Sequence, residues 1–399
     1  MSRAEQLGAR DVPLPERCDV AIVGGGVMGL STAYHLADID EKLRIVVLER
    51  GYLVSGASGR NGGGVRMQWG DEGNVQIMME SIEICRGLAQ ELGINLWFRQ
   101  GGYLFLARGE AGEQRLRRNA ELHRRLGAPT RLLGPDEAKE LVPELDTSQV
   151  RLAAFNPQDG VVFPWPFVWG YAAQAIARGV VVRTHTAAER AEPSGDGLLL
   201  HLSTGERLHA QRVVNATGAW CHGLNHSLGV TLPNRPHRHE ILSTEPLKPF
   251  LDPLVVDLES GLYFSQSTRG EIVAGITLPD HAPPVLEVDQ RSSLRFLAHL
   301  GAALTRLMPL TGAVKVLRQW AGPYDVSPDG DAIVGPSLGQ PALLQLCGFT
   351  GHGFMMAPAV GRMLARFIAK GERHAMLERW DPTRFARGDA HVREDMIIG

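Results

Sequence analysis

The start of the chain has two short apolar runs separated by a stretch of helical character. Residues 19–23 form the first run, which ends in glycines, and residues 43–48 form the second. Such runs are typical of strands buried in a parallel sheet, and residues 27–37 between them have helical character. The pattern predicts a β-α-β unit, whose crossover is right-handed.

Later segments continue this alternation of strands and helices. Residues 74–92 and 167–178 have helical spacing, and a strand is expected at 180–182. Residues 198–202 and 207–208 flank a turn and predict a hairpin. Further strands are expected at 211–216 and 343–347 and throughout 230–318, with helices at 292–307 and 358–370.

The charge of the chain argues against two classes of partner. The chain has 399 residues, with 41 Lys and Arg against 44 Asp and Glu, so its net charge is −3. Such a length suits two to three domains of about 150 residues. A balanced chain has no general attraction for nucleic acid or an anionic membrane. The highly charged stretch 110–145 is therefore interpreted as a pair of solvent-facing helices.

Other compositional features indicate a cytoplasmic protein. No run of about 18 apolar residues occurs, so no transmembrane segment is expected. Residues 1–17 lack the apolar core of a secretory signal. The four cysteines are far apart and form no CxxC, which argues against a disulfide framework or a zinc ribbon. They are Cys18, Cys85, Cys221 and Cys347.

The glycines concentrate in motifs that carry chemistry. The chain has 46 glycines, and a GxGxxG motif lies between the first strand and the first helix. In this motif Gly24 allows a tight turn, Gly26 lets the backbone approach a pyrophosphate, and Gly29 lets helix and strand pack closely. The helix N-terminus then faces the phosphates. The sequence predicts a dinucleotide site at Gly24, Gly26, Val27, Met28 and Gly29.

Two further features decide which dinucleotide is expected. Glu49 at the end of the second strand is placed to accept hydrogen bonds from an adenosine ribose. Arg50 would suit a 2′-phosphate, but the intact Glu49 argues against NADP. The turn after the strand at 211–216 resembles the ATG turn of flavoproteins and favours FAD over NAD. Its candidate cofactor-binding residues are Ala216, Gly218 and Trp220.

Most of the chain resembles the D-amino-acid-oxidase/sarcosine-oxidase superfamily. Within it, the chain most resembles the flavin-bearing β subunits of multi-subunit proline dehydrogenases and sarcosine oxidases. Four stretches carry the resemblance: the GxGxxG loop with Glu49, SGASGRNGGGVR at 55–66, WAGPYDVSPDGDAIVG at 320–335 and CGFTGHGFMMAPAVG at 347–361.

The resemblance implies an α/β fold with two domains. One is a Rossmann-like FAD-binding domain of the glutathione-reductase type, and the other is a mixed-sheet α+β substrate domain. The FAD-binding domain is expected to be discontinuous. Its segments are 17–85, 150–225 and 325–385; the substrate domain takes 86–149 and 226–324; residues 1–16 and 386–399 are tails.

The stretch 55–66 resembles the segment that lies along the flavin. The expected cofactor contacts in it are Ser58, Arg60, Asn61, Gly62 and Gly63. The glycines let the backbone approach a planar ring, and Arg60 and Asn61 would supply donors. Arg66 aligns with an arginine that holds the substrate carboxylate in amino-acid-oxidising relatives, where a guanidinium grips bidentately. The alternative for Arg66 is a structural ion pair.

The loop 348–353 resembles the one beneath the pyrimidine edge of the flavin, where loop N–H groups and a helix dipole stabilise negative charge. The resemblance makes Tyr263 and His352 catalytic candidates beside Arg66. The alternatives are a half-buried strand tyrosine and a satisfied structural histidine. The cluster 237–240 suggests no metal, since its residues alternate between strand faces. The remaining cofactor candidates are Gly322, Asp329, Gly351, His352, Gly353, Phe354 and Met355.

Departures from the family pattern shape the remaining expectations. Gly322 and Pro323 stand where monomeric sarcosine oxidases have a flavin-linked cysteine, and 161–166 has no histidine, so FAD is expected to be non-covalent. Met355 replaces a carboxylate-binding lysine of some relatives. Val273 falls where oxygen-using sarcosine oxidases carry an oxygen-activating lysine.

The implied activity is oxidation of an amino acid or secondary amine, of proline, hydroxyproline, sarcosine or opine type, by hydride transfer to flavin N5. Electrons would pass to α or γ partner subunits, with FMN or an iron–sulfur cluster at an interface. The alternatives are a self-contained oxidase that makes hydrogen peroxide and a non-catalytic flavin-bearing subunit. The apolar end Met396, Ile397 and Ile398 is either a docking element or disordered. Contact with a membrane is expected only through partners.

Overall fold

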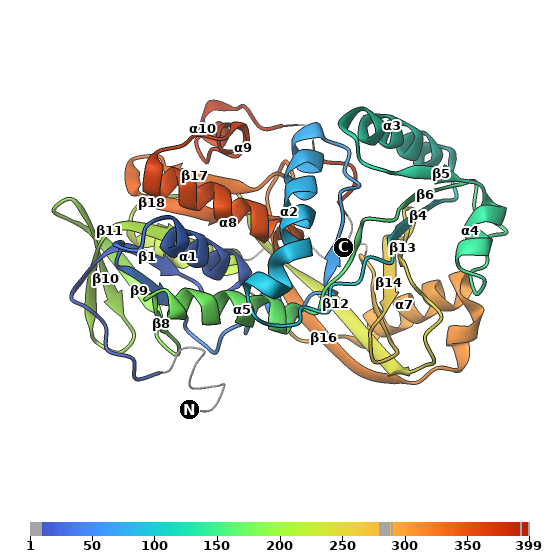
Figure 1. Ribbon diagram of the computed structural model, residues 1–399, viewed down its shortest axis with the longest axis horizontal. Coiled ribbons are helices and arrows are strands. Elements are labelled where there is room, and N and C mark those ends of the chain that lie inside the picture. The colour runs from blue at the N-terminus through green and yellow to red at the C-terminus, as the bar shows by residue number, and fades with distance from the viewer. Residues whose placement is uncertain (1–9, 279–287, 289, 392, 398–399) are drawn as a thin grey trace.

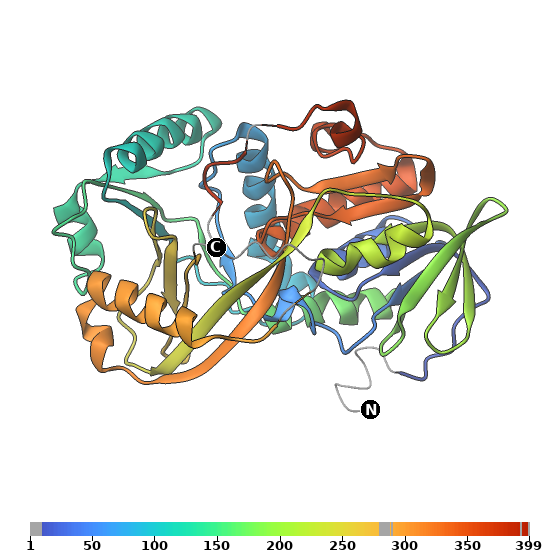
Figure 2. The same ribbon diagram turned by 180° about the vertical axis from the view of Figure 1, so that it is seen from behind.

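The computed structural model describes residues 10–278, 288, 290–391 and 393–397. Two large sheets lie side by side along the longest axis of the molecule (Figures 1 and 2). None of the helices in these ranges combines the length and the apolar composition needed to cross a membrane.

The first sheet contains the predicted β-α-β unit. Its main order is β17-β18-β11-β1-β2-β8, in which β18, β11, β1, β2 and β8 are parallel and β17 is an antiparallel edge. Parallel strands buried between layers require the near-continuous apolar runs from which they were predicted. The strands are β1 (Arg17–Val23), β2 (Ile45–Leu48), β8 (Val181–Arg183), β9 (Ala188–Ser194), β10 (Gly197–Leu202), β11 (Arg207–Asn215), β17 (Ile333–Ser337) and β18 (Gln340–Cys347).

One strand of this sheet is longer than predicted. The segments expected as a hairpin arm at 207–208 and a separate strand at 211–216 form the single strand β11. Its first half pairs with β10 in the expected hairpin, and β18 pairs with its last residues, whereas β1 pairs with it from His209 to Asn215. The different neighbours of the two halves explain why the sequence pattern changes midway.

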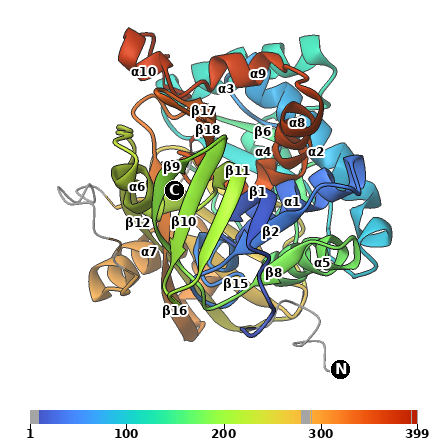
Figure 3. The ribbon, with the colours of Figure 1, turned by 90° about the vertical axis from the view of Figure 1, so that its left-hand side faces the viewer.

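Helices cover one face of the first sheet (Figure 3). Helix α1 (Val27–Ile39) packs between α5 (Pro164–Ala177) and α8 (Gly353–Lys370), and it is buried almost throughout. The other helices are α2 (Glu72–Glu91), α3 (Glu110–Leu126), α4 (Pro135–Leu141), α6 (Cys221–Ser227), α7 (Leu294–Leu307), α9 (Ala375–Arg379) and α10 (Arg384–Arg387), with short 3-10 turns at Ala57–Gly59, Gly218–Trp220 and Pro309–Ala313.

Helix α8 begins five residues earlier than the expected start at 358. Pro358 lies inside the helix and cannot donate a backbone hydrogen bond. Neighbouring helices hold the turn before it: Ser81 Oγ donates to the carbonyl of Met355 at 2.5 Å, and Ser31 Oγ donates to that of Ala357 at 2.8 Å. The early start brings the N-terminus of α8 to the loop 348–353.

The second sheet has the order β16-β12-β15-β14-β13-β4-β6-β5. All neighbours are antiparallel except β13 and β4, which makes this the expected mixed sheet. The strands are β4 (Tyr103–Ala107), β5 (Arg131–Leu133), β6 (Leu152–Asn156), β12 (Arg235–Pro246), β13 (Leu254–Asp257), β14 (Leu262–Gln266), β15 (Glu271–Gly275) and β16 (Val316–Val326), and a separate small sheet pairs β3 (Gly64–Val65) with β7 (Gly160–Val161).

The two faces of the second sheet have different neighbours. On one face Phe264 and Ile272 pack with Phe296 and Leu300 of α7 in a single apolar core. Side chains alternate across a strand, so Tyr263 of β14 lies on the opposite face. That face borders the cavity described below.

Two details of this region differ from expectation. The charged stretch 110–145 is not only a helical pair, because β5 lies between α3 and α4 and joins the sheet edge through β6. The domain boundaries stay a prediction. We propose one refinement, that residues 152–156 belong with the second domain, because β6 pairs with β4 and β5.

Candidate active site

The turn after β1 brings two predicted cofactor segments together. Gly24 has φ +117°, a conformation that side chains other than glycine rarely adopt, and a Cβ there would overlap the backbone of Ala216. A Cβ on Gly29 would overlap the carbonyl oxygen of Gly24. The GxGxxG turn therefore lies against the turn that follows β11, as the parallel pairing of β1 with β11 requires.

Glu49 supplies hydrogen-bond acceptors and the start of α1 supplies donors, a combination suited to a dinucleotide. Glu49 is 9% exposed, and its two oxygens accept the N–H groups of Gly25 and Gly51, each at 2.8 Å. No Lys or Arg of the described chain forms an ion pair with it. A carboxylate without a counter-ion retains acceptor capacity for hydroxyl donors such as those of a ribose. The free N–H groups of a helix start attract phosphate.

The segment 55–66 reaches this helix start. Ser58 Oγ accepts the N–H of Val27 at 3.0 Å. Asn61 fixes the loop itself, since its Nδ2 donates to the carbonyl of Ser58 at 2.6 Å and its Oδ1 accepts the N–H of Gly63 at 2.7 Å. Arg60 likewise donates to the carbonyls of Ser55 and Gly56. These side chains shape the loop, and its glycines Gly62, Gly63 and Gly64 line a cavity.

The remaining cofactor candidates lie around these loops. Arg50 is exposed and stacks over the ring of Trp220, with its guanidinium carbon 4.0 Å from the ring centroid. A Cβ on Gly322 would lie 3.2 Å from Arg60 Cβ, and one on Gly353 would lie 3.3 Å from Cε of Met28. Each therefore adjoins a predicted cofactor segment. Gly218 has φ +54° in the turn after β11.

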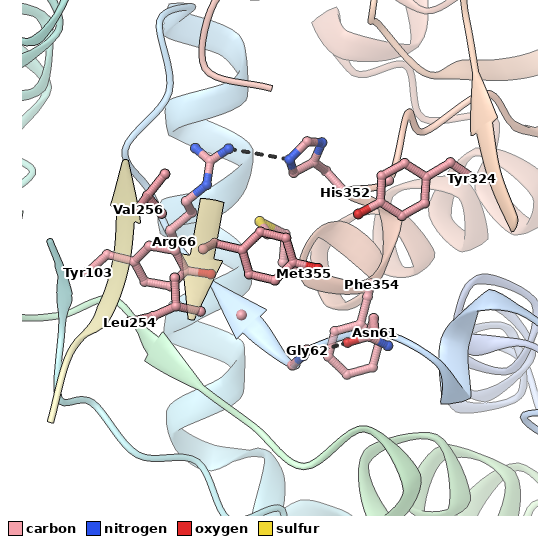
Figure 4. A pocket seen from close by; sticks show the side chains of 14 residues that line it. Asn61, Gly62, Arg66, Tyr103, Leu254, Val256, Tyr324, His352, Phe354 and Met355 are labelled. Atoms are coloured by element: carbon pink, nitrogen blue, oxygen red, sulfur yellow. Dashed lines mark hydrogen bonds between the residues drawn. The ribbon is translucent and has the colours of Figure 1, made fainter. Parts of the chain in front are cut away.

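A cavity opens between these loops and the second sheet (Figure 4). Its walls come from the segment 61–66, from strands β4, β13, β14 and β16, and from the loop and helix start at 351–355. Some of its lining residues were predicted from the sequence, and the others were not. The lining residues are Asn61, Gly62, Gly63, Gly64, Arg66, Tyr103, Leu254, Val256, Tyr263, Tyr324, Gly351, His352, Phe354 and Met355.

An aromatic stack forms one wall. His239 stacks between Tyr263 and Tyr324, with ring centroids 5.7 and 4.7 Å away, and its Nε2 lies 2.9 Å from the hydroxyl of Tyr263. Gly275 of β15 leaves room for Tyr263, whose ring a Cβ at that position would overlap. Burial lowers the pKa of His239 to about 3 and raises the pKa of Tyr263 well above its usual range. The stack is therefore uncharged at neutral pH.

His352 is a neutral acceptor beside Arg66. Its Nδ1 lies 2.9 Å from the carbonyl of Thr350, which can only accept, so Nδ1 carries the hydrogen. Its Nε2 then accepts from Nη2 of Arg66 at 3.4 Å, the dashed contact of Figure 4. Burial and the charge of Arg66 hold the pKa of His352 well below its usual range.

Arg66 is the only residue with a permanent charge among the described lining residues. It is 2% exposed, donates to the carbonyls of Gln68 and Met396, and lies 4.1 Å from the centroid of the Trp69 ring. No carboxylate among the described residues forms an ion pair with it, so the alternative of a structural ion pair has no partner there. Burial lowers its pKa. Asp159 and Glu394 act on this charge without forming an ion pair with it. A buried cation that no carboxylate contacts favours an anionic ligand.

Three other expected residues lie elsewhere. Asp329 binds Arg384 through both oxygens at 3.0 and 2.9 Å and does not line the cavity, so its carboxylate is already engaged. Val273 is half-buried in β15 and also does not line the cavity. Met396 is 1% exposed and packs within this chain, so at Met396 the expected disorder is wrong. Ile398 lies outside the described residues.

Sequence reasoning missed the residues from separate strands, chiefly Tyr103, Leu254, Val256 and Tyr324. The alternating pattern of each strand indicates which residues share a face. Nothing in a single strand indicates which face borders a cavity. Met396 was missed because it reaches Arg66 from 330 positions away in the sequence.

Comparisons with known proteins extend over both sheets. The model of the family described as FAD dependent oxidoreductase matches residues 19–367. FAD-dependent oxidoreductase domain-containing protein 1 of Xenopus laevis is 31% identical, over 90% of this chain and 81% of that protein. Sarcosine oxidase subunit beta of an Arthrobacter species is 28% identical, over 94% and 93%. The crystal structure of L-proline dehydrogenase from P. horikoshii has a TM-score of 0.89 and 33% identity, and the match covers 95% of this chain and 100% of that one.

Proposed function

Because this chain belongs to the family of FAD-dependent oxidoreductases, we propose that it oxidises a small amino acid or secondary amine at the carbon next to nitrogen. The candidate substrates are of proline, hydroxyproline, sarcosine or opine type. One observation carries the proposal: a buried guanidinium that no carboxylate of the described chain contacts lines an otherwise neutral cavity. The cavity lies beside the cofactor loops, which are the turn 24–29, the segment 55–66 and the loop 348–353.

The loop geometry supports a set of cofactor-binding residues. Glu49 would accept the ribose hydroxyls, the start of α1 would face the pyrophosphate, and the backbone at 62–64 would lie along the flavin. When bound, FAD accepts the hydride and both electrons from the substrate carbon. All four cysteines are buried outside the cavity lining, which supports non-covalent binding. Acid precipitation should leave the yellow colour in the supernatant, and colour in the pellet would contradict this.

The cavity favours a substrate with one anionic group and an apolar body. Arg66 would hold the carboxylate, while Leu254, Val256 and Phe354 offer an apolar surface to the rest of the molecule. None of the described lining residues is acidic, so a substrate ammonium has no ionic partner there. The site would therefore bind the amine in its neutral form, the form that can release a hydride.

We further propose that the reduced cofactor delivers its electrons to a partner subunit. No lysine lines the cavity within the described chain, so no ammonium there would stabilise developing superoxide. The likeness to a sarcosine oxidase subunit beta supports a multi-subunit assembly. FMN or an iron–sulfur cluster at the subunit interface would accept the electrons.

One anaerobic experiment tests the proposal. The holoprotein is mixed with proline, hydroxyproline, sarcosine, opines and other amino acids, and bleaching of the flavin absorbance is followed. We expect at least one secondary amino acid to bleach it. If none does, the proposal that this chain is an enzyme is wrong, and a non-catalytic flavin-bearing subunit is favoured. Air is then admitted in a stopped-flow instrument. Rapid reoxidation with stoichiometric peroxide would favour a self-contained oxidase instead.

A further inference from the structure

The last described residues of the chain form a strap, residues 393–397, that is anchored next to the cavity. Glu394 is 6% exposed, and its oxygens accept the N–H of Gly70 at 2.8 Å and an Nδ2–H of Asn74 at 3.1 Å. Met396 packs with Tyr103 and with other apolar side chains. In Figures 1 and 2 the red C-terminal stretch runs beside α2, the helix that contains Asn74. Hydrogen bonds and apolar packing thus hold the strap in place beside the cavity.

The strap contacts the guanidinium of Arg66 through Met396. The carbonyl oxygen of Met396 accepts from Nη2 at 2.5 Å, and His352 Nε2 lies 3.4 Å from the same nitrogen. Nη2 carries two hydrogens, so both are directed to protein acceptors. A guanidinium can grip a carboxylate bidentately through its Nη1 and Nη2 edge or its Nε and Nη2 edge. Both edges include Nη2, and in this arrangement neither is free.

We propose that the strap is an internal occupant of the carboxylate subsite, in which the Met396 carbonyl holds Arg66 until the substrate carboxylate displaces it. This rests on the proposed function of Arg66. A guanidinium this buried needs acceptors at all times, and the carbonyl supplies one when no substrate is present. A carboxylate is the stronger acceptor because its hydrogen bonds are charge-assisted. An amine without a carboxylate cannot make this exchange, so the strap selects amino acids over simple amines.

Hydrogen exchange tests the displacement directly in the holoprotein. The probe is pyrrole-2-carboxylate, a planar carboxylate with no hydrogen on the carbon that joins the nitrogen to the carboxylate, and pyrrole is its control. Binding is followed by the flavin absorbance, and exchange is followed by mass spectrometry of C-terminal peptides. We expect backbone exchange at 394–397 to rise severalfold with the carboxylate and not with pyrrole. A carboxylate that binds without changing this exchange would overturn the proposal.

A pair of variants tests how firmly the strap is held. Glu394→Gln removes the charge that anchors the strap, and we expect the Kd of pyrrole-2-carboxylate to fall by about three- to tenfold, the effect of about one hydrogen bond. Asp395→Asn is the matched control, because Asp395 contacts Arg115 and Arg118 in partly exposed ion pairs, each at 3.7 Å. It should change the Kd less than about twofold. Equal Kd values for both variants and the unchanged chain would count against the strap.

The outcomes separate this proposal from the proposed function. Flavin bleaching by an amino acid, together with unchanged exchange in the strap, leaves the function standing and removes the strap as occupant. Failure of every carboxylate to perturb the flavin removes both. The exchange measurement on the unchanged chain decides the question even where Glu394→Gln fails to fold.

Discussion

The cofactor loops and the substrate cavity are neighbouring regions built in opposite ways. In the cofactor loops, backbone groups and a few short side chains make the surface, as at Gly24, Gly29 and Ser58. In the cavity, large side chains from distant strands make it, as at Tyr103 and Tyr324. The first surface depends on the absence of side chains, and the second depends on their identity.

This difference predicts how each region responds to substitution. Adding a methyl group to a backbone surface obstructs the fold and the ligand together. Changing a side chain of the cavity leaves the fold and the cofactor in place and alters the substrate step. Substitutions in each region test this division.

Gly29→Ala should have the largest effect. The added Cβ would overlap the carbonyl of Gly24 and lie 3.1 Å from a methyl group of Ile22. Overpacking of this kind costs about 1–3 kcal/mol, and here it also displaces the turn proposed to face the pyrophosphate, so most bound FAD should be lost. The measurement is FAD content after gel filtration together with urea unfolding.

Gly87→Ala is the matched control for this substitution. Gly87 is exposed in α2, and a Cβ there has no neighbour within 4 Å. In a helix interior this change should stabilise by about 0.5–1 kcal/mol. Normal FAD content in Gly29→Ala would show that the cofactor loop tolerates a side chain, which breaks the division.

Arg66→Lys should lower kcat/KM by about 10- to 100-fold, the effect expected when a hydrogen bond to a charged group is lost. The FAD content should stay unchanged. A lysine ammonium keeps the charge but cannot reproduce the planar fork. Steady-state kinetics with the best substrate, together with the flavin absorbance, measures both quantities. Normal kinetics in Arg66→Ala would remove the carboxylate role.

The sequence predicted the backbone of the first cofactor loop well because its signals are local. The strand, glycine turn and helix from β1 to α1, and Glu49 at the end of β2, lie within about 30 residues, a span in which composition determines backbone shape. The family resemblance added the segment 55–66 and the loop 348–353. The structure brings both to the cavity, where Asn61, Arg66 and His352 line it.

The cavity wall was predictable only in part because its signals are not local. Tyr263 entered through the resemblance, yet its partner His239 was considered only for metal binding. The contact between His239 and Tyr324 depends on the register of β12 against β16, which a sequence does not reveal. The bond from Arg66 to Met396 depends on how the chain end packs. The start of α8 was placed too late because Pro358 is more typical of a first helical turn.

Glu49→Gln should weaken FAD binding by about 1.5 kcal/mol, or about tenfold in Kd, because a charged acceptor is replaced by a neutral amide. Catalysis by the FAD-loaded fraction should stay normal, since Glu49 does not line the cavity. Fluorescence titration of the apoprotein with FAD gives the Kd. An unchanged Kd would mean that the carboxylate serves only the N–H groups of Gly25 and Gly51.

The smallest effect concerns the pH dependence of the aromatic stack. Burial lowers the pKa of His239 from 6.5 to about 3. Between these values the unfolded chain binds more protons, so this histidine stabilises the fold fully above pH 6.5 and progressively less as the pH falls towards 3. The slope is at most about 1.4 kcal/mol per pH unit. Buried His35, whose pKa is lowered to about 4, acts in the same direction.

His239→Phe keeps a ring in the stack and removes the titration. We expect a lower stability at pH 7, because the Tyr263 hydroxyl loses its contact with His239. We also expect a shallower fall between pH 6 and 5, by up to about 1 kcal/mol. Urea unfolding of the holoprotein at pH 7, 6 and 5 measures the slope. His299→Gln, an exposed position in α7, is the control and should leave it unchanged. FAD content should stay normal in His239→Phe, because the stack belongs to the substrate cavity and not to the cofactor loops. Loss of FAD in this variant, with an unchanged slope, would show that the two regions do not respond separately.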